Sequence, residues 1–377
     1  MTEMASKRTL TECMSVIEDP RVERTRYHEL LDILVLSVLA VMCGAEGWED
    51  IANFGKIRKG WLKQFIKLKN GIPSHDTISR VFRAVKPDAF QAAFREWLIE
   101  MDLMGGADVI AIDGKSLRRS HDGVFKKMLH SVSAWSVANN VMLGQQAVDE
   151  KSNEITAIPL LLKSLQLKGA IITIDAMGCQ KEIAKQIHEG GGDYVLALKD
   201  NQPSLAKAVE QHFLDAHETE APTTELRQHT TAEKGHRRVE HRQYFHSPIP
   251  ANIRHLFVDW PGAKSIGQAI NEIERDGKQT SEVRYFISSL DVGVKKFANA
   301  VRGHWSIENK LHWTLDVTFN EDQSRIRKDH GAENFALVRR YVLSIIKLDT
   351  SKGSMRSKRK MAAWSEDYLL SLLKNVV

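Results

Sequence analysis

The sequence has only three cysteines among 377 residues, and none of them lies in a C-x-x-C pair. The scattered Cys13, Cys43 and Cys179 exclude a disulfide-stapled fold and argue against zinc-finger and thioredoxin-like sites, so we expect a reducing, cytoplasmic environment. We also expect no signal peptide, because charged residues are spread over the first 20 positions. The longest apolar stretch, residues 33–43, is shorter than the roughly 18 residues of a membrane span and predicts a buried helix.

Internal repeats and low-complexity segments are absent as well. Hydrophobic residues make up 42% and charged residues 27% of the chain, which excludes a disordered or collagen-like protein. A length of 377 residues is enough for two or three domains with a sizeable core.

Positive charge is concentrated near the C-terminus. Residues 321–377 contain 12 Lys and Arg against 7 Asp and Glu, a net charge of +5 that equals the excess of the whole chain. Such a cluster can follow a phosphate backbone, and it can equally be a solvated surface. Its densest part consists of Lys352, Arg356, Lys358, Arg359 and Lys360.

The first 100 residues are predicted to form a helical domain. Apolar residues recur at helical spacing between positions 27 and 98, and the Pro-Ser-His-Asp sequence at 73–76 is typical of a helix start. The helix that follows carries Arg80 and Arg83. It can be a recognition helix whose arginines contact DNA, or an amphipathic helix that only packs against its neighbours.

The pattern between residues 101 and 350 predicts a mixed α/β sheet flanked by helices. Residues 200–293 are interpreted as a β-rich insertion, and a basic segment follows at 351–377. The expected strands are 109–113, a hairpin of 128–137 and 141–148, 170–175 and 194–199, with further strands near 223–244, 255–260 and 282–289. The expected helices are 155–167, 180–188 and one long helix at 295–319.

Two of these strands end in the same way. An aliphatic run leads into Asp113 and Gly114, and a second one leads into Asp175 and Ala176. Ligands of α/β sheets lie beyond the carboxyl ends of the strands, so both carboxylates are candidates for a site at this edge. Each aspartate can alternatively be a helix cap or a turn residue.

Glu308 is the third candidate carboxylate. When residues are placed at about 100° intervals along the predicted long helix, Glu308 falls within the apolar stripe of that helix. A carboxylate that faces a core is costly unless it is paired or binds a metal, so either a buried ion pair or a metal site is expected. The stripe itself contains Phe297, Val301, Trp305, Leu311 and Leu315.

Three converging carboxylates repel one another unless cations neutralise them. Oxygen ligands without a cysteine cluster favour Mg²⁺ or Mn²⁺, and two such ions can support in-line attack on a phosphodiester. His304, His312 and Asp316 lie on the same helix as Glu308, but Asp316 is about 12 Å along the axis from Glu308 and cannot share its ions. His304 and His312 can contact phosphate or support the site. The sequence contains no H-E-x-x-H motif, so a zinc hydrolase is not favoured.

Several long motifs resemble those of the H-repeat-associated (Rhs-linked) insertion-sequence transposases. The resemblance covers nearly the whole chain. It implies a bacterial DDE transposase with a ribonuclease-H-like core after an associated helical domain, in which Asp113, Asp175 and Glu308 hold two Mg²⁺ or Mn²⁺ ions. The motifs are residues 47–51, 73–77, 110–118, 153–159, 173–180 and 302–313, together with 315–317 and 321–322.

The resemblance also implies partners. Double-stranded DNA would be bound at terminal inverted repeats and at the target, in the bacterial nucleoid, without a small-molecule cofactor. Because two DNA ends must be handled together, we expect a homodimer on the DNA.

Related transposases with a β insertion carry Tyr seven residues before the glutamate, Arg four residues before it and Lys seven residues after it. This sequence has Val301, His304 and Leu315 there, so His304 and Arg302 are the expected substitutes. The remaining candidates for DNA contact or support of the site are Lys115, Arg118, Lys199, Asn201, His236 and Arg238.

Two sets of residues have open alternatives. The basic segment at 234–238, which includes His236 and Arg238, can contact a DNA backbone or guard a strand edge with charge. Trp260 and Trp305 can stack on an extruded base or belong to the core.

Three functions are therefore compared. The leading hypothesis is a transposase that cleaves and joins DNA. The second is a DNA-binding remnant of a transposase without activity, and the third is a structure-selective nuclease that never joins ends.

Overall fold

The computed structural model describes residues 7–120, 128–148, 152–218, 226–235, 238–374 and 376–377, and all structural statements concern these residues. One nine-stranded sheet has the order β3-β2-β1-β4-β5-β9-β8-β7-β6. β1, β4 and β5 are parallel, and the other neighbouring pairs are antiparallel. The strands are β1 (Val109–Ser116), β2 (His130–Ser136), β3 (Val141–Ala147), β4 (Ile171–Ile174), β5 (Asp193–Leu198), β6 (Arg227–Gly235), β7 (Arg238–Pro248), β8 (Ser265–Arg275) and β9 (Lys278–Ser288).

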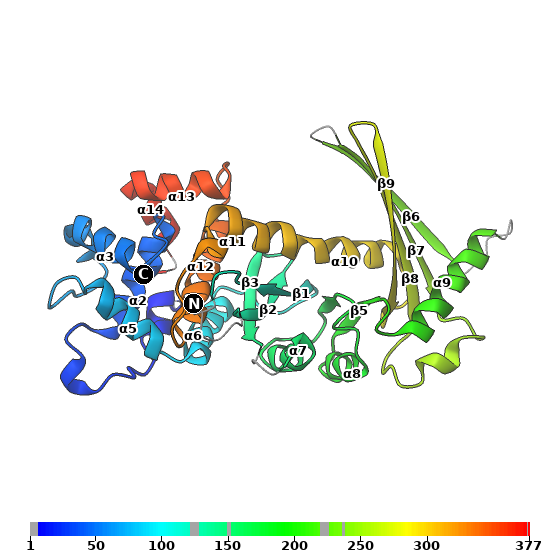
Figure 1. Ribbon diagram of the computed structural model, residues 1–377, viewed down its shortest axis with the longest axis horizontal. Coiled ribbons are helices and arrows are strands. Elements are labelled where there is room, and N and C mark those ends of the chain that lie inside the picture. The colour runs from blue at the N-terminus through cyan, green and yellow to red at the C-terminus, as the bar shows by residue number, and fades with distance from the viewer. Residues whose placement is uncertain (1–6, 121–127, 149–151, 219–225, 236–237, 375) are drawn as a thin grey trace, which may run out of the picture.

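Helices cover both faces of the parallel part of the sheet (Figure 1). α7 (Glu154–Lys163) and α8 (Lys181–Glu189) pack on one face, and α10 (Val294–Ser306) crosses the other face over β1 and β4. Burial on both faces explains why β4 is the continuous apolar run Ile-Ile-Thr-Ile. The predicted mixed α/β sheet with flanking helices is confirmed, and so is the predicted hairpin.

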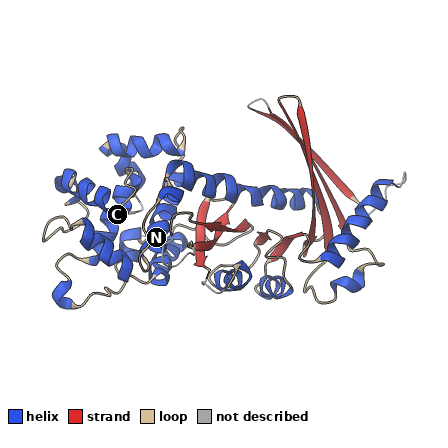
Figure 2. Ribbon diagram, in the orientation of Figure 1, coloured by secondary structure: helices blue, strands red, loops and turns tan. Residues whose placement is uncertain are grey.

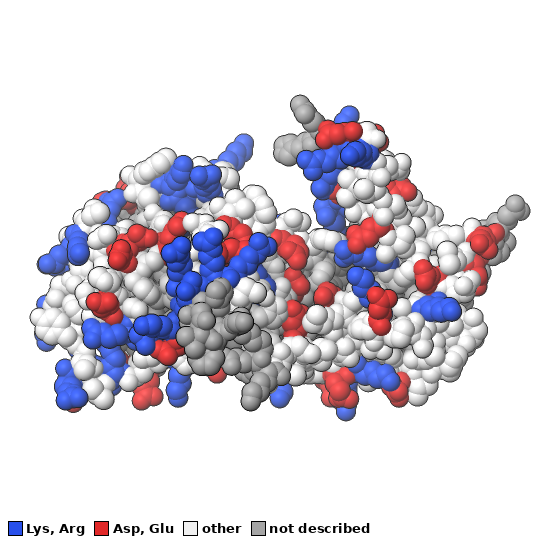
Figure 3. Space-filling view, in the orientation of Figure 1, with Lys and Arg blue, Asp and Glu red and all other residues white. Residues whose placement is uncertain are grey.

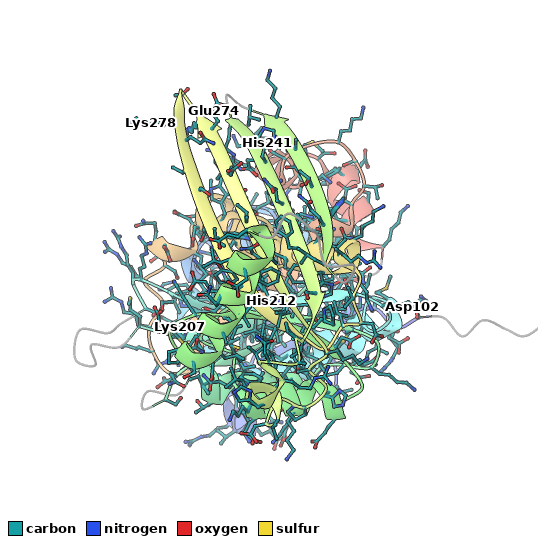
Figure 4. All side chains as sticks on the ribbon, turned by 90° about the vertical axis from the view of Figure 1, so that its right-hand side faces the viewer. Asp102, Lys207, His212, His241, Glu274 and Lys278 are labelled. Atoms are coloured by element: carbon teal, nitrogen blue, oxygen red, sulfur yellow. The ribbon has the colours of Figure 1, made fainter. Side chains whose placement is uncertain are left out.

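The last four strands form a long antiparallel arm that projects beyond the level of α10 (Figures 1 and 2). Figure 4 views this arm from its own end of the molecule and places Glu274 and Lys278 near its tip. The strand expected at 255–260 is wrong, because residues 254–257 form a 3₁₀ turn, η2.

Two elements of this region were not predicted, α9 (Pro203–Glu218) and β8. The buried residues of α9, Leu205, Val209 and Phe213, recur every four positions, which is the helical period.

The predicted helix 295–319 is a continuous helical segment with an irregular middle. α10 leads into a π-helical segment, η3 (Ile307–His312), which leads into α11 (Trp313–Thr318). π segments inside α-helices are rare and often lie at functional sites. Glu308 and His312 both belong to this segment.

The part of the molecule opposite the arm is helical. It contains the N-terminal and the C-terminal helices of the chain (Figures 1 and 2). α12 (Gly331–Leu348) packs on α2 (Leu30–Met42) and also on β3, so it joins the helical end to the sheet. The predicted buried helix at 33–43 is confirmed as the C-terminal part of α2 and its C-cap residue, Cys43, and no described helix is long and apolar enough to cross a membrane. The helices are α1 (Leu10–Met14), α2 (Leu30–Met42), α3 (Trp48–Ile57), α4 (Lys59–Leu62), α5 (His75–Ala84), α6 (Pro87–Glu100), α12 (Gly331–Leu348), α13 (Met355–Trp364) and α14 (Glu366–Leu373).

The domain boundaries at residues 100 and 350 stay predictions. The segment 351–377 contains α13 and α14, and α13 packs on α2 and α12. Within its basic cluster, Lys358 and Arg359 are buried and donate hydrogen bonds to backbone carbonyls. Lys352, Arg356 and Lys360 are exposed, so only part of the cluster is available to a partner.

Gly267→Ala is expected to destabilise the protein by about 1–3 kcal/mol, because it overpacks the contact between β8 and α10. A Cβ atom at Gly267 would lie 2.2 Å from the ring of Phe297, which is fully buried. Urea unfolding measures the effect. Gly60→Ala is the matched control, because open space surrounds Gly60 in α4 and alanine favours a helix there. Equal stability of the two variants would contradict this packing argument.

Candidate active site

Asp113 and Asp175 lie beside each other on neighbouring parallel strands. β1 and β4 pair in the register Ile112↔Ile174, so the two aspartates follow laterally paired residues about 4.8 Å apart. Asp113 lies inside β1, which continues to Ser116 against β2, and is therefore not at a strand end as predicted. Asp175 follows the end of β4 and accepts a hydrogen bond from the Gly178 amide at 3.3 Å. It is thus both a turn residue and a neighbour of Asp113.

Glu308 reaches this pair from the π segment. It hydrogen-bonds with Asp113, although its side chain is 53% exposed. Glu308 therefore faces the sheet, as the apolar stripe predicted, but the prediction that its side chain is buried is wrong. Phe297 and Val301 pack on the sheet, whereas Glu308 lies in the wall of an open hollow of about 540 Å³. Of the three candidate carboxylates, Glu308 lines this hollow, whereas Asp175 lines a separate cavity.

His312 completes a close cluster with Asp113 and Glu308. Its Nδ1 atom is 3.4 Å from Oδ2 of Asp113 and 3.8 Å from Oε2 of Glu308. Potential ligand atoms of the three residues all lie within 4.8 Å of one another. The His312 side chain is only 7% exposed, and its Nε2 atom is buried without a hydrogen-bond partner.

The carboxylates of this centre have perturbed pKa values. Burial raises the pKa of Asp113 to about 8, with further contributions from the hydrogen bond to Glu308 and from the charges of Glu308 and Asp175. The pKa of Glu308 is lowered, chiefly by the neighbouring imidazole of His312. Burial also raises the pKa of Asp175. The protein alone therefore keeps a proton on Asp113 near neutral pH, and a bound cation would replace that proton.

The donor set fits a hard divalent cation. Two half-buried carboxyl groups with raised pKa values and a third at the edge of the hollow provide oxygen ligands of the kind that Mg²⁺ and Mn²⁺ prefer.

Glu154 and His130 also belong to this region, and no role was predicted for either. The ring nitrogens of His130 are 2.7 Å from Oγ of Ser116 and 2.7 Å from a carboxylate oxygen of Glu154. The Glu154 charge contributes to the raised pKa of Asp175, after the effects of burial and of a backbone hydrogen bond. The available signal was the family motif at 153–159, which contains Glu154.

Gly114→Ala is expected to lower the free energy of unfolding by about 1–3 kcal/mol. A Cβ atom there would lie 2.0 Å from the Glu154 carboxylate, which His130 holds in place. The same substitution is expected to cost much less in a Glu154→Ala background, and urea unfolding of the four proteins forms the thermodynamic cycle. An equal cost in both backgrounds would show that the Glu154 contact is not the cause.

The predicted basic residues near the site are already engaged with acids. The Nζ atom of Lys115 is 2.7 Å from both carboxylate oxygens of Asp316, and its side chain is only 9% exposed. Arg118 is mostly exposed and forms an ion pair of 3.2 Å with Asp322. Asp316 therefore binds Lys115 rather than the carboxylate centre, in agreement with its expected distance from Glu308.

His304 and Arg302 were expected to replace the Tyr, Arg and Lys of related transposases. In the structure, the two side chains contact different parts of the protein. Nδ1 of His304 is 3.1 Å from Oγ1 of Thr173 on β4, and burial lowers its pKa to about 4, so the ring is neutral. Arg302 is partly exposed and pairs with Glu233 of the arm at 3.2 Å.

Lys199 and Asn201 lie near Asp175, and their role in DNA contact or in support of the site stays a prediction. Lys199 lines a second cavity of about 580 Å³ together with Asp175, His304 and Trp305. Asn201 donates hydrogen bonds to the carbonyls of Ala176 and Cys179, so it fixes the turn that carries Asp175.

The other predicted contacts are distributed over the molecule. Arg238 on the arm pairs with Glu240, whereas His236 lies outside the described residues. On the helical end, Arg80 is exposed and Arg83 pairs with Asp329 at 2.7 Å. On the face shown in Figure 3, basic side chains gather on the helical end and on the arm, with acidic side chains between them.

The two candidate tryptophans have different environments. Trp260 is 3% exposed and belongs to the core, so base stacking by Trp260 is excluded. Trp305 is half-buried beneath the guanidinium group of Arg284, 4.3 Å from its ring centre.

Comparison with known proteins identifies the family. Residues 104–345 match the family model described as Transposase DDE domain, and residues 11–98 match the model described as DDE_Tnp_1-associated. The chain belongs to the DDE transposase family. This chain is 43% identical over 375 residues to the H repeat-associated putative transposase YhhI of Escherichia coli K12, covering 97% of both chains. It is 40% identical to the putative transposase YncI of Escherichia coli O157:H7, covering 98% of this chain and 95% of the relative.

The predicted family of insertion-sequence transposases is thus confirmed, and the nine-stranded mixed sheet with its helices is consistent with the ribonuclease-H-like fold of the DDE domain. One short relative is named as inactive. The inactive transposase YbfQ of Escherichia coli K12 is 50% identical over 72 residues, which are 19% of this chain and 86% of the relative.

Proposed function

We propose that this protein is an active DNA transposase, which binds the terminal inverted repeats of its element, cleaves the DNA at each end and joins the ends to target DNA. The observation that supports this function best is the contact between Glu308 and Asp113 beside the strand that leads into Asp175. Asp113 and Asp175 are lateral neighbours on parallel strands, and Glu308 reaches Asp113 from the helix above them.

Asp113, Asp175 and Glu308 would hold two Mg²⁺ or Mn²⁺ ions. When bound, such ions activate an attacking hydroxyl group and stabilise the leaving oxygen of a phosphodiester. The chain itself contributes rigidity and desolvation. β1 and β4 fix both aspartates, and Asn201 holds the turn after Asp175.

The distribution of basic groups supports double-stranded DNA as the partner. The exposed Arg80 on α5 and the exposed Arg356 and Lys360 on α13 flank the carboxylates on one side, and Arg238 of the arm lies on the other. DNA that bridges both parts would pass the hollow beside Glu308. Since two ends must be joined together, we propose a homodimer on the DNA.

The decisive experiment uses a supercoiled plasmid with the element's own ends, incubated with the full chain and Mg²⁺ or Mn²⁺. We expect strand-transfer products that EDTA abolishes and that a plasmid with scrambled ends does not give. Sequencing of the joined products identifies the ends.

Two other outcomes correspond to other functions. Cleavage without joining would identify a nuclease, and end binding without cleavage under any divalent metal would identify an inactive remnant. Absence of both binding and cleavage would overturn the proposal altogether.

A further inference from the structure

His312 is the histidine of the carboxylate cluster, and its two ring nitrogens have unusual surroundings. Among the described residues, Asp113, Glu308 and His312 are the set of metal-ligand side chains that converges within 4.8 Å. His312 is almost fully buried, yet its Nε2 atom has no hydrogen-bond partner and its Nδ1 atom faces only carboxylates. Nδ1 is therefore the nitrogen of His312 that a cation shared with the carboxylates would contact.

The distances are unfavourable for ordinary hydrogen bonds. N–H···O bonds have lengths of about 2.7–3.2 Å, whereas Nδ1 of His312 is 3.4 Å and 3.8 Å from the two carboxylates. Two ligands that each lie about 2.1 Å from a shared cation are separated by roughly 3.0–3.5 Å. The cluster is therefore closer to the spacing of ligands around one ion than to that of a hydrogen-bonded pair.

The other two histidines of this region are already occupied. His130 contacts Ser116 and Glu154 through its two ring nitrogens, and His304 contacts Thr173. The π segment carries Glu308 and His312 on the side of the helix that faces Asp113, so one helical turn offers both an oxygen and a nitrogen ligand.

We infer that His312 is a nitrogen ligand of one of the two metal ions, which makes this centre a set of three carboxylates and one imidazole. This inference rests on the proposed function, because it assumes that the carboxylates bind metal. Imidazole favours Mn²⁺ and later transition metals much more than Mg²⁺. His312 thus biases the site toward Mn²⁺, and Asp113 and Glu308 bind the same ion.

The test uses the full chain with Mn²⁺ alone, without DNA. Pulsed electron paramagnetic resonance detects directly bound nitrogen, and titration calorimetry measures affinity. We expect a nitrogen coupling in the wild type and in the control variant His304→Asn, and none in His312→Asn. The affinity of His312→Asn for Mn²⁺ should fall by about 10–100-fold, with a smaller loss for Mg²⁺.

A second variant, His312→Gln, and thermal unfolding of every protein separate loss of a ligand from loss of the fold. Mn²⁺ bound without nitrogen coupling in the wild type, coupling that persists in both His312 variants, or no Mn²⁺ binding at all would overturn the inference. Nitrogen coupling without any DNA cleavage would contradict only the proposed function. Cleavage with Mn²⁺ bound through oxygen alone would contradict only the role of His312.

Discussion

Asp113→Asn is expected to lower metal-dependent DNA cleavage by on the order of 1,000-fold and, at the same time, to stabilise the metal-free protein. The loss of activity follows from the position of Asp113, which contacts Glu308 and His312 and adjoins Asp175. Asparagine keeps the shape of the side chain but supplies no negative charge for a cation. Cleavage of DNA that carries the element's ends measures this loss.

The gain in stability follows from the pKa of Asp113. Its value of about 8 in the folded chain is raised from an ordinary value of 3.8 by burial and by the neighbouring carboxylates. An acid whose pKa is raised on folding binds protons more tightly in the folded state, so stability is lost as the pH rises from about 4 to about 8. At neutral pH the neutral asparagine avoids this loss, and we expect a gain of roughly 1–3 kcal/mol without metal.

Urea unfolding in EDTA at several pH values measures this difference. The wild type should lose stability relative to Asp113→Asn as the pH rises through this range, and the two should converge in acid. Asp259→Asn is the control, because Asp259 is an exposed residue paired with Lys181, and it should change neither cleavage nor the pH profile. A variant that is inactive and also less stable than the wild type would show that Asp113 is a structural residue instead.

The carboxylates could be predicted because two aliphatic strands lead into Asp113 and Asp175, and a parallel sheet places such positions side by side. The sequence pattern also placed Glu308 on the correct side of its helix. Its exposure was not predictable, since residue periodicity does not show where the sheet beneath a helix ends.

The roles of the two helix histidines could not be assigned from spacing. Both lie four residues from Glu308, yet His304 faces Thr173 and His312 faces Asp113. The π segment between them is a local change in helical geometry that a uniform 100° rotation does not include. Glu154 and His130 are 24 residues apart and meet only in the folded sheet.

The burial of two basic side chains in the C-terminal region could not be predicted from the sequence either. Lys358 and Arg359 have neighbours of the same charge, but Lys358 is buried against Asp349 at the end of α12 and Arg359 against Val41 of α2. Clustered charge in a sequence therefore predicts a surface only when the helical face that carries it is known.

Glu321→Gln is expected to destabilise the protein by about 3–5 kcal/mol, the largest effect on stability among these predictions. Glu321 forms an ion pair of 2.7 Å with Arg340 of α12, and both side chains are fully buried. Arg339 is buried next to Arg340, and burial lowers its pKa to about 10. Glutamine fills the same volume but leaves a buried positive charge without its acid.

The pair lies where the candidate active site meets the helical end. Glu321 faces Arg340 in the helical core, while the adjacent Asp322 pairs with Arg118 behind the end of β1. The Glu321-Asp322 sequence therefore connects the strand that carries Asp113 to α12. Loss of the buried pair should loosen this connection as well as lower the stability of the fold.

Urea unfolding followed by circular dichroism measures the effect of Glu321→Gln. Glu366→Gln is the matched control, because Glu366 pairs with Arg58 at the surface with half of its side chain exposed, and such pairs contribute about 1 kcal/mol at most. The double variant Glu321→Leu with Arg340→Met should recover much of the lost stability, because apolar residues of similar size remove both buried charges. If the double variant is as unstable as Glu321→Gln, the cost comes from packing around residue 321 and not from an unpaired charge.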